Sequence, residues 1–141
     1  MIVAGCDSGS LTAKAVIMHN GEMVSNAVIR ARTNPSESAE AVMQKALEQA
    51  GLARESIRHV VGTGYGRKQI PFVNSVESEI SCHAKGAWRI LPSTRMVIDI
   101  GGQDAKATRI DENGAVSRYI YNDKCASGTG RFLEIMAEAL E

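Results

Sequence analysis

The fold of this chain is decided by two octapeptides, DSGSLTAK at residues 7–14 and DIGGQDAK at residues 99–106. Four residue types recur in them at the same offsets, namely Asp7 and Asp99, Gly9 and Gly101, Ala13 and Ala105, and Lys14 and Lys106. Each octapeptide lies between β-type runs, and an Asn-Gly pair follows, at 20–21 and at 113–114, which predicts a hairpin with a type I′ turn. One inserted residue aligns the two copies. The duplication predicts two related lobes, each opening with three strands.

The segments outside the repeated hairpins predict helices with clear ends. Asn34 is a suitable N-cap before Pro35, and Gly51 is a suitable C-terminal cap, so a helix is expected between them. The expected elements are a helix over 35–50, a short strand over 57–62, a helix over about 76–91, a strand over 95–100 and a helix from about 128. The predicted order is βββαβα in the first lobe and βββα in the second.

Composition excludes several classes of protein. The 16 Lys and Arg residues balance 16 Asp and Glu residues, which argues against a nucleic-acid binder that works by neutralising phosphates. No run of 18 apolar residues exists, so no transmembrane helix is predicted, and the N-terminal segment lacks a secretory pattern. We therefore expect a cytoplasmic protein. Three cysteines, Cys6, Cys82 and Cys125, form neither a disulfide framework nor a zinc-site spacing.

Each repeated turn carries groups that can bind a phosphate. Its backbone N–H groups can face an anion, and a carboxylate beside it can hold Mg²⁺ through water, because Mg²⁺ keeps most of its hydration shell. In the second turn, Gln103 and Asp104 could orient an attacking water. The predicted nucleotide contacts are Gly9, Ser10, Leu11, Thr12, Lys14, Gly101, Gly102, Gln103 and Lys106, with Asp7 and Asp99 for Mg²⁺. A single Asp-Gly is more often only a tight turn, but its duplication favours nucleotide phosphate binding.

The sequence resembles the BadF/BadG/BcrA/BcrD family, which includes the activator ATPases of 2-hydroxyacyl-CoA dehydratases. That family lies within the superfamily of acetate and sugar kinases, heat-shock chaperones and actin, whose hallmark is one Asp-Gly phosphate hairpin in each lobe. The resemblance spans essentially the whole chain. The stretches that carry it are GCDSGSLTAK at 5–14, GTGYGR at 62–67, EISCHAKGA at 79–87, DIGGQDAK at 99–106 and NDKCASGTGRFLE at 122–134.

The resemblance implies an α/β protein with a ribonuclease H-like, actin-like ATPase lobe over 1–93 and the incomplete start of a second such lobe over 94–141. It implies that ATP hydrolysis to ADP drives an electron from a 4Fe–4S cluster to a CoA-ester dehydratase or reductase. Such a cluster is shared across a homodimer, and a ferredoxin or flavodoxin is the expected electron donor. By motif match, Cys125 is one cluster ligand, and its place near a predicted helix N-terminus suits a thiolate. No nucleic acid or membrane is expected as a partner.

The chain departs from the family pattern in one respect. A second cluster cysteine is expected some tens of residues after Cys125, but the sequence ends at Glu141. We therefore expect a truncated chain that binds nucleotide weakly. Two alternatives stay open: a small-molecule kinase of the same superfamily, with Asp99 or Asp104 as base, and an inactive fragment.

The remaining candidates have simpler explanations. Cys6 and Cys82 are expected to be ordinary packed residues, and His83 is expected to be packed or surface-facing rather than a ligand. Lys14 and Lys106 could contact phosphate, although a lysine after a strand turn is more often a solvated surface charge.

Overall fold

The computed structural model describes residues 1–122 and 130–140, apart from the side chain of Arg131. The chain divides into two compact units, Met1–Glu79 and Ile80–Glu141. The predicted lobe boundary between residues 93 and 94 stays a prediction, because a compact unit need not coincide with a lobe. Within the described part of the chain, no helix combines the length and the apolar character needed to cross a bilayer.

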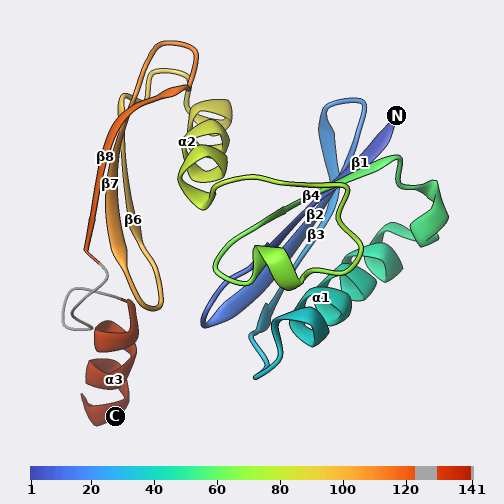
Figure 1. Ribbon diagram of the computed structural model, residues 1–141, viewed down its shortest axis with the longest axis horizontal. Helices are drawn as coiled ribbons and strands as arrows, with labels where there is room; N and C mark the ends of the chain where they lie inside the picture. The colour runs from blue at the N-terminus through green and yellow to red at the C-terminus, as the bar shows by residue number, and fades with distance from the viewer. Residues whose placement is uncertain (123–129, 141) are drawn as a thin grey trace. The chain divides into compact units, whose positions relative to one another are not determined.

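The first unit is built on a five-stranded sheet. Its strands are β1 (Ile2–Ser8), β2 (Thr12–His19), β3 (Glu22–Arg30), β4 (His59–Thr63) and β5 (Ser75–Val76). Their order in the sheet is β3-β2-β1-β4-β5, in which β1, β2 and β3 are antiparallel while β4 runs parallel to β1 and β5. The central position of β1 means that the turn at its end is supported from both sides (Figure 1).

The turn between β2 and β3 is the predicted hairpin. Asn20 has a φ of 52° and Gly21 a φ of 88°. Positive φ at both central residues defines the type I′ turn, whose twist matches that of the flanking strands. The prediction from Asn-Gly is confirmed here.

Helix α1 (Pro35–Ala50) forms where the capping residues predict it. The Asn34 side chain accepts a hydrogen bond from Ser36 N at 2.9 Å, and Gly51 adopts the left-handed conformation with a φ of 64°. A side-chain acceptor at the N-terminus and a glycine after the last turn satisfy backbone groups that a helix end leaves unpaired. Figure 1 shows α1 lying along the five-stranded sheet.

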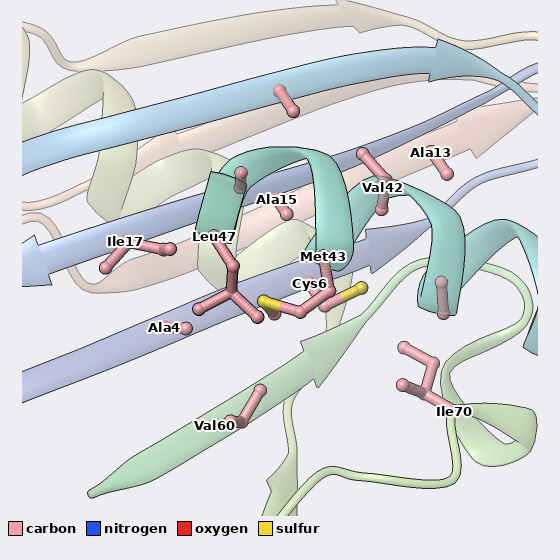
Figure 2. Close-up of a cluster of buried hydrophobic side chains, with 13 residues drawn as sticks. Ala4, Cys6, Ala13, Ala15, Ile17, Val42, Met43, Leu47, Val60 and Ile70 are labelled. Atoms are coloured by element: carbon pink, nitrogen blue, oxygen red, sulfur yellow. The ribbon is translucent and has the colours of Figure 1, made fainter. Parts of the chain in front are cut away.

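The core of the first unit lies between α1 and the sheet. The strands contribute mostly small residues, which let the helix approach closely, and α1 contributes the larger Val42, Met43 and Leu47 (Figure 2). The strand residues in this core are Ala4, Cys6, Ala13, Ala15, Ile17, Ala27 and Val60. A chain with 4% aromatic residues therefore fills its core with aliphatic side chains and methionine.

Cys6 belongs to this core and is 1% exposed. Burial raises the pKa of its thiol from 9.0 to about 12, with a smaller contribution from the neighbouring Asp7 carboxylate. Because the thiolate is the reactive and metal-binding form, Cys6 is a packing residue, as the sequence predicts.

The second unit is built on a three-stranded antiparallel sheet in the order β6-β7-β8. Its strands are β6 (Met96–Ile100), β7 (Ala105–Ile110) and β8 (Val116–Asn122). Helix α2 (Glu79–Ile90) precedes the strands and α3 (Gly130–Leu140) follows them. All the predicted elements are present, while the two-residue strand β5 was not predicted.

The connection between β7 and β8 differs from the predicted type I′ turn, so that prediction is wrong. Of Asn113 and Gly114, only Gly114 has a positive φ, 75°. Gly114 N donates to Asp111 O at 3.2 Å, and the Asp111 carboxylate accepts from the backbone N–H groups of Asn113 and Ala115, both at 2.8 Å. These two hydrogen bonds lower the pKa of Asp111. The inserted residue thus turns the hairpin into a longer loop that an aspartate closes.

Trp88 fixes α2 to this loop. Its indole Nε1 donates to Glu112 O at 2.9 Å, and Lys85 Nζ donates to Asn113 O at 2.8 Å. A Cβ atom at Gly114 would lie 2.7 Å from the Trp88 ring, so the glycine also allows this close contact. The position of α2 on the second unit is therefore defined by specific contacts.

We predict that Leu47→Ala lowers the free energy of unfolding by about 2–5 kcal/mol, because it leaves a cavity beneath α1. The matched control is Lys45→Ala on the exposed side of the same helix, which should change it by less than about 0.5 kcal/mol. Urea denaturation measures both. Equal effects of the two substitutions would contradict the assigned core.

Candidate functional site

The first repeated turn joins β1 to β2. Gly9 N donates to Thr12 O at 3.1 Å across the turn. One step back along the hairpin, Asp7 and Lys14 stand opposite each other in register, and Lys14 Nζ lies 3.0 Å from Asp7 Oδ2. The carboxylate is mostly buried, with 18% of its side chain exposed, whereas the Lys14 side chain is 45% exposed. The turn thus holds a carboxylate and an ammonium group beside a short glycine-containing loop.

The second repeated turn joins β6 to β7 and has the same geometry. Gly101 N donates to Asp104 O at 2.8 Å, and Asp99 stands opposite Lys106 in register. These are the positions that align with Gly9, Thr12, Asp7 and Lys14 in the sequence. The repeat in the sequence is therefore a repeat of backbone hydrogen bonding and of a facing Asp–Lys pair.

The charges of the second turn are arranged differently from those of the first. Lys106, which is 7% exposed, lies 2.6 Å from Asp104 Oδ1 and 3.9 Å from Asp99 Oδ2. His83 Nδ1 lies 2.9 Å from Asp99 Oδ2. The interpretation of Lys106 as a solvated surface charge is wrong, because an acid two residues away pairs with it in the interior. Lys14, by contrast, is substantially exposed.

The contact between His83 and Asp99 was missed by the sequence analysis. The two residues are 16 positions apart, on a helix and a strand that only the tertiary fold brings together. The one available signal was that His83 lies within the motif at residues 79–87.

A glycine-rich loop supports the first turn. Gly66 N donates to Ser8 O at 2.8 Å, and the Arg67 guanidinium donates to Gly64 O at 3.0 Å. Gly64 has a φ of 89°, and a Cβ atom there would lie 2.1 Å from Asp7 Oδ1. The loop can approach the carboxylate only because this position is glycine. The motif at 62–67 thus holds Asp7 in place from the neighbouring strand.

Helix α3 begins at the second turn. Gly130 N donates to Gly101 O at 2.8 Å, and a Cβ atom on Gly130 would lie 3.0 Å from the same oxygen. The predicted cluster ligand Cys125 lies outside the described residues, which leave out 123–129.

The other predicted nucleotide contacts lie within the two turns. Ser10 and Leu11 lie between β1 and β2, and Gly102 and Gln103 lie between β6 and β7. All are at least partly exposed. The predicted site residues of each turn are therefore gathered at one end of their own sheet.

The acidic residues of the turns fit a hydrated magnesium ion better than a directly coordinated metal. Over the described residues, no group of three His, Cys, Asp or Glu side chains could hold a metal ion. Asp7 and Asp99 each stand with a cationic or N–H donor partner, Lys14 or His83. A single carboxylate of this kind can hold Mg²⁺ through its water shell, because Mg²⁺ gives up its waters reluctantly.

Two Asp-x-Gly hairpins in mixed α/β units are characteristic of an ATPase with an actin-like fold. The same fold is shared by the ROK hexokinase from Thermus thermophilus, with a TM-score of 0.56 at 14% identity over 84% of this chain and 48% of that one. It is also shared by the ethanolamine utilization protein EutJ from Carboxydothermus hydrogenoformans, with a TM-score of 0.65 at 12% identity over 99% and 57%.

The chain belongs to the BadF/BadG/BcrA/BcrD ATPase family, whose model matches residues 4–141. It is 47% identical over 142 residues to the activator of lactoyl-CoA dehydratase from Anaerotignum propionicum, covering 100% of this chain and 54% of that protein. It is 36% identical over 145 residues to a subunit of the benzoyl-CoA reductase from Thauera aromatica, covering 99% and 51%.

Two solved activators share its structure closely. The (R)-2-hydroxyglutaryl-CoA dehydratase component A from Acidaminococcus fermentans has a TM-score of 0.93 at 38% identity, over 99% of this chain and 54% of that one. The activator of the 2-hydroxyisocaproyl-CoA dehydratase from Clostridium difficile, solved with bound ADPNP, has a TM-score of 0.93 at 45% identity, over 99% and 52%. The chain spans about half the length of the curated relatives it matches.

We predict that Gly64→Ala disrupts the first turn, because its Cβ atom would collide with the Asp7 carboxylate at a φ that alanine avoids. The expected loss of unfolding free energy is more than about 2 kcal/mol. The matched control is Gly51→Ala, which has a φ of 64° but nothing within 4 Å of its Cβ, and should cost only about 1–2 kcal/mol. Urea denaturation measures both losses, and equal losses would contradict the close approach of this loop to Asp7.

Proposed function

We propose that the protein binds ATP and Mg²⁺ through its two Asp-x-Gly turns and acts as part of an ATP-hydrolysing activator of a CoA-ester dehydratase or reductase. The observation that carries this proposal is the repeated turn, in which a glycine N–H closes the loop and an aspartate faces a lysine. A relative of matching fold was solved with bound ADPNP, which supports a nucleotide as the ligand.

The chemistry proposed for the first turn is phosphate binding. The Ser10 and Thr12 hydroxyls and the backbone N–H groups of the turn would donate hydrogen bonds to phosphate oxygens. Asp7 would accept hydrogen bonds from the waters of Mg²⁺, which neutralises phosphate charge when it is bound. Lys14, already beside Asp7, would add a positive charge at the same place.

The chemistry proposed for the second turn is the orientation of the attacking water. Gln103 is exposed, and Asp104 is held in place by the buried Lys106. A carboxylate that pairs with a lysine is favoured in its ionised form and can accept a hydrogen bond from the attacking water. Asp99 would play the part of Asp7 for the magnesium shell.

Coupling to electron transfer is the further part of this proposal. A 4Fe–4S cluster, bound in part by Cys125 and shared across a homodimer, would supply a low-potential electron to the dehydratase or reductase, with a ferredoxin or flavodoxin as donor. The names of the relatives, activators of CoA-ester dehydratases and a benzoyl-CoA reductase subunit, favour this role over the small-molecule kinase. Among the cysteines, Cys6 does not suit a cluster, because burial keeps its thiol protonated.

We predict magnesium-dependent ATP binding with a dissociation constant of about 0.1–1 mM for this chain, because it spans only half the length of its relatives. Asp7→Ala should weaken binding about 5- to 30-fold, which corresponds to about 1–2 kcal/mol. Glu55→Gln, an exposed acid of the same unit, is the matched control and should leave the affinity unchanged. Calorimetric titration measures all three proteins. No binding at millimolar nucleotide, or equal affinity with and without Mg²⁺, would contradict the proposal.

The cluster assignment makes a separate prediction for anaerobic reconstitution with iron and sulfide. Cys125→Ala should abolish iron binding, because cluster iron is held by cysteine thiolates, whereas Cys82→Ala should retain it. Bound iron per chain and the visible absorption spectrum are the measurements. Iron that survives Cys125→Ala, or that is lost in Cys82→Ala, would show that the cluster role belongs elsewhere.

A further inference from the structure

The two turns differ in what holds the aspartate at the end of the first strand. In the first turn, Lys14 Nζ lies 3.0 Å from Asp7 Oδ2. In the second turn, the equivalent Lys106 lies 2.6 Å from Asp104 and only 3.9 Å from Asp99. The position that aligns with Asp104 is Thr12 in the first copy, which offers no competing carboxylate. Asp104 has therefore drawn the lysine away from the aspartate that it would otherwise face.

His83 takes the place that the lysine leaves. Its Nδ1 lies 2.9 Å from Asp99 Oδ2, and a carboxylate oxygen can only accept, so the proton of this hydrogen bond belongs to Nδ1. The Asp99 side chain is 24% exposed and the His83 side chain 40% exposed, so the pair lies at the edge of the turn. Both contacts to Asp99, from His83 and from Lys106, fall on Oδ2.

The helix that carries His83 is held firmly. Ala84, the next residue along, is fully buried, and one turn later Trp88 donates its indole N–H to Glu112 O. Lys85 donates to the same loop at Asn113 O and lies over the Trp88 ring at 4.5 Å. Because these contacts fix α2 against the β7–β8 loop, the imidazole reaches Asp99 from a rigid support.

We propose that His83 is a positioning residue for the second turn: it holds Oδ2 of Asp99 so that the other oxygen of the carboxylate is directed to the water shell of nucleotide-bound Mg²⁺. This rests on the proposed nucleotide-binding function. It assigns to a helix outside the Asp-x-Gly turn the part that Lys14 plays within the first turn. Lys106 is thereby left to Asp104, so that the second turn orients two carboxylates where the first orients one.

The experiment compares His83→Leu with His83→Asn in the full chain. The Asn side-chain nitrogen is bonded to Cγ, as Nδ1 is in histidine, so Asn can keep the hydrogen bond to Asp99 while Leu cannot. Calorimetric titration with ATP, with and without Mg²⁺, measures affinity, and urea denaturation checks that each variant is folded. The matched control is His59→Leu, which removes an exposed histidine of the first unit that contacts Ser75 Oγ by its ring nitrogen.

We expect His83→Leu to weaken binding of Mg²⁺-ATP about 5- to 10-fold, as the loss of one hydrogen bond to a charged group does, and to change metal-free ATP binding less than about twofold. His83→Asn should restore the affinity to within about threefold of the original protein, and His59→Leu should leave it unchanged. Equal affinity of the Leu variant and the original protein, or an Asn variant as weak as the Leu variant, would overturn the role of His83. If the original protein itself binds no Mg²⁺-ATP, the proposed function fails, and this role fails with it.

A second readout needs no nucleotide. Nitrogen-15 NMR of the histidine side chains should show His83 in the Nδ1–H form, and Asp99→Ala should remove that preference. An Nε2–H form in the original protein would overturn the proposal even if the nucleotide titrations agreed with it.

Discussion

The feature on which both units depend is the local hydrogen bond that closes each Asp-x-Gly turn. A glycine N–H donates to the carbonyl three residues later, from Gly9 to Thr12 and from Gly101 to Asp104. This bond fixes the register of the two strands that the turn joins, and the register in turn places an aspartate opposite a lysine. The chemistry proposed for the protein follows from that placement, since the carboxylate and the ammonium group are delivered to the same end of each sheet.

The two units build different surroundings around the same hairpin. In the first, the face of β1 that carries Ala4, Cys6 and Ser8 is buried under α1. The aligned residues of β6 are Met96, Ile98 and Ile100, which are all exposed. The small residues of the first copy suit a helix packed at close range, whereas the larger ones of the second copy do not. The hairpin is thus the part that the two copies share, and the packing around it differs.

The elements of the fold could be predicted because their signals are local. Asn34, Gly51 and the Asn-Gly pair at 20–21 act through their own backbone and side chains, and each forms the predicted cap or turn. The loop at 111–115 could not be predicted in the same way, because the Asp111 carboxylate accepts two backbone hydrogen bonds and overrides the turn that Asn113-Gly114 favours.

The candidate site was predicted only in part. The turn residues were found because they repeat, and the family resemblance gave the ligand class that the comparisons support. The pairing of Asp99 with His83 and the burial of Lys106 depend on contacts between elements, which spacing along the chain does not report. The glycines at 64 and 66 were recognised as a motif, but their function of supporting Asp7 became visible only when β4 was placed beside β1.

The central claim is that both turns are phosphate-binding elements for the same nucleotide. The most direct measurement is an NMR titration of the nitrogen-15-labelled chain with Mg²⁺-ATP, following the backbone amides of residues 9–12 and 101–104. The account predicts that amides of both turns shift with the same dissociation constant. Shifts confined to one turn, or found only outside both, would contradict it.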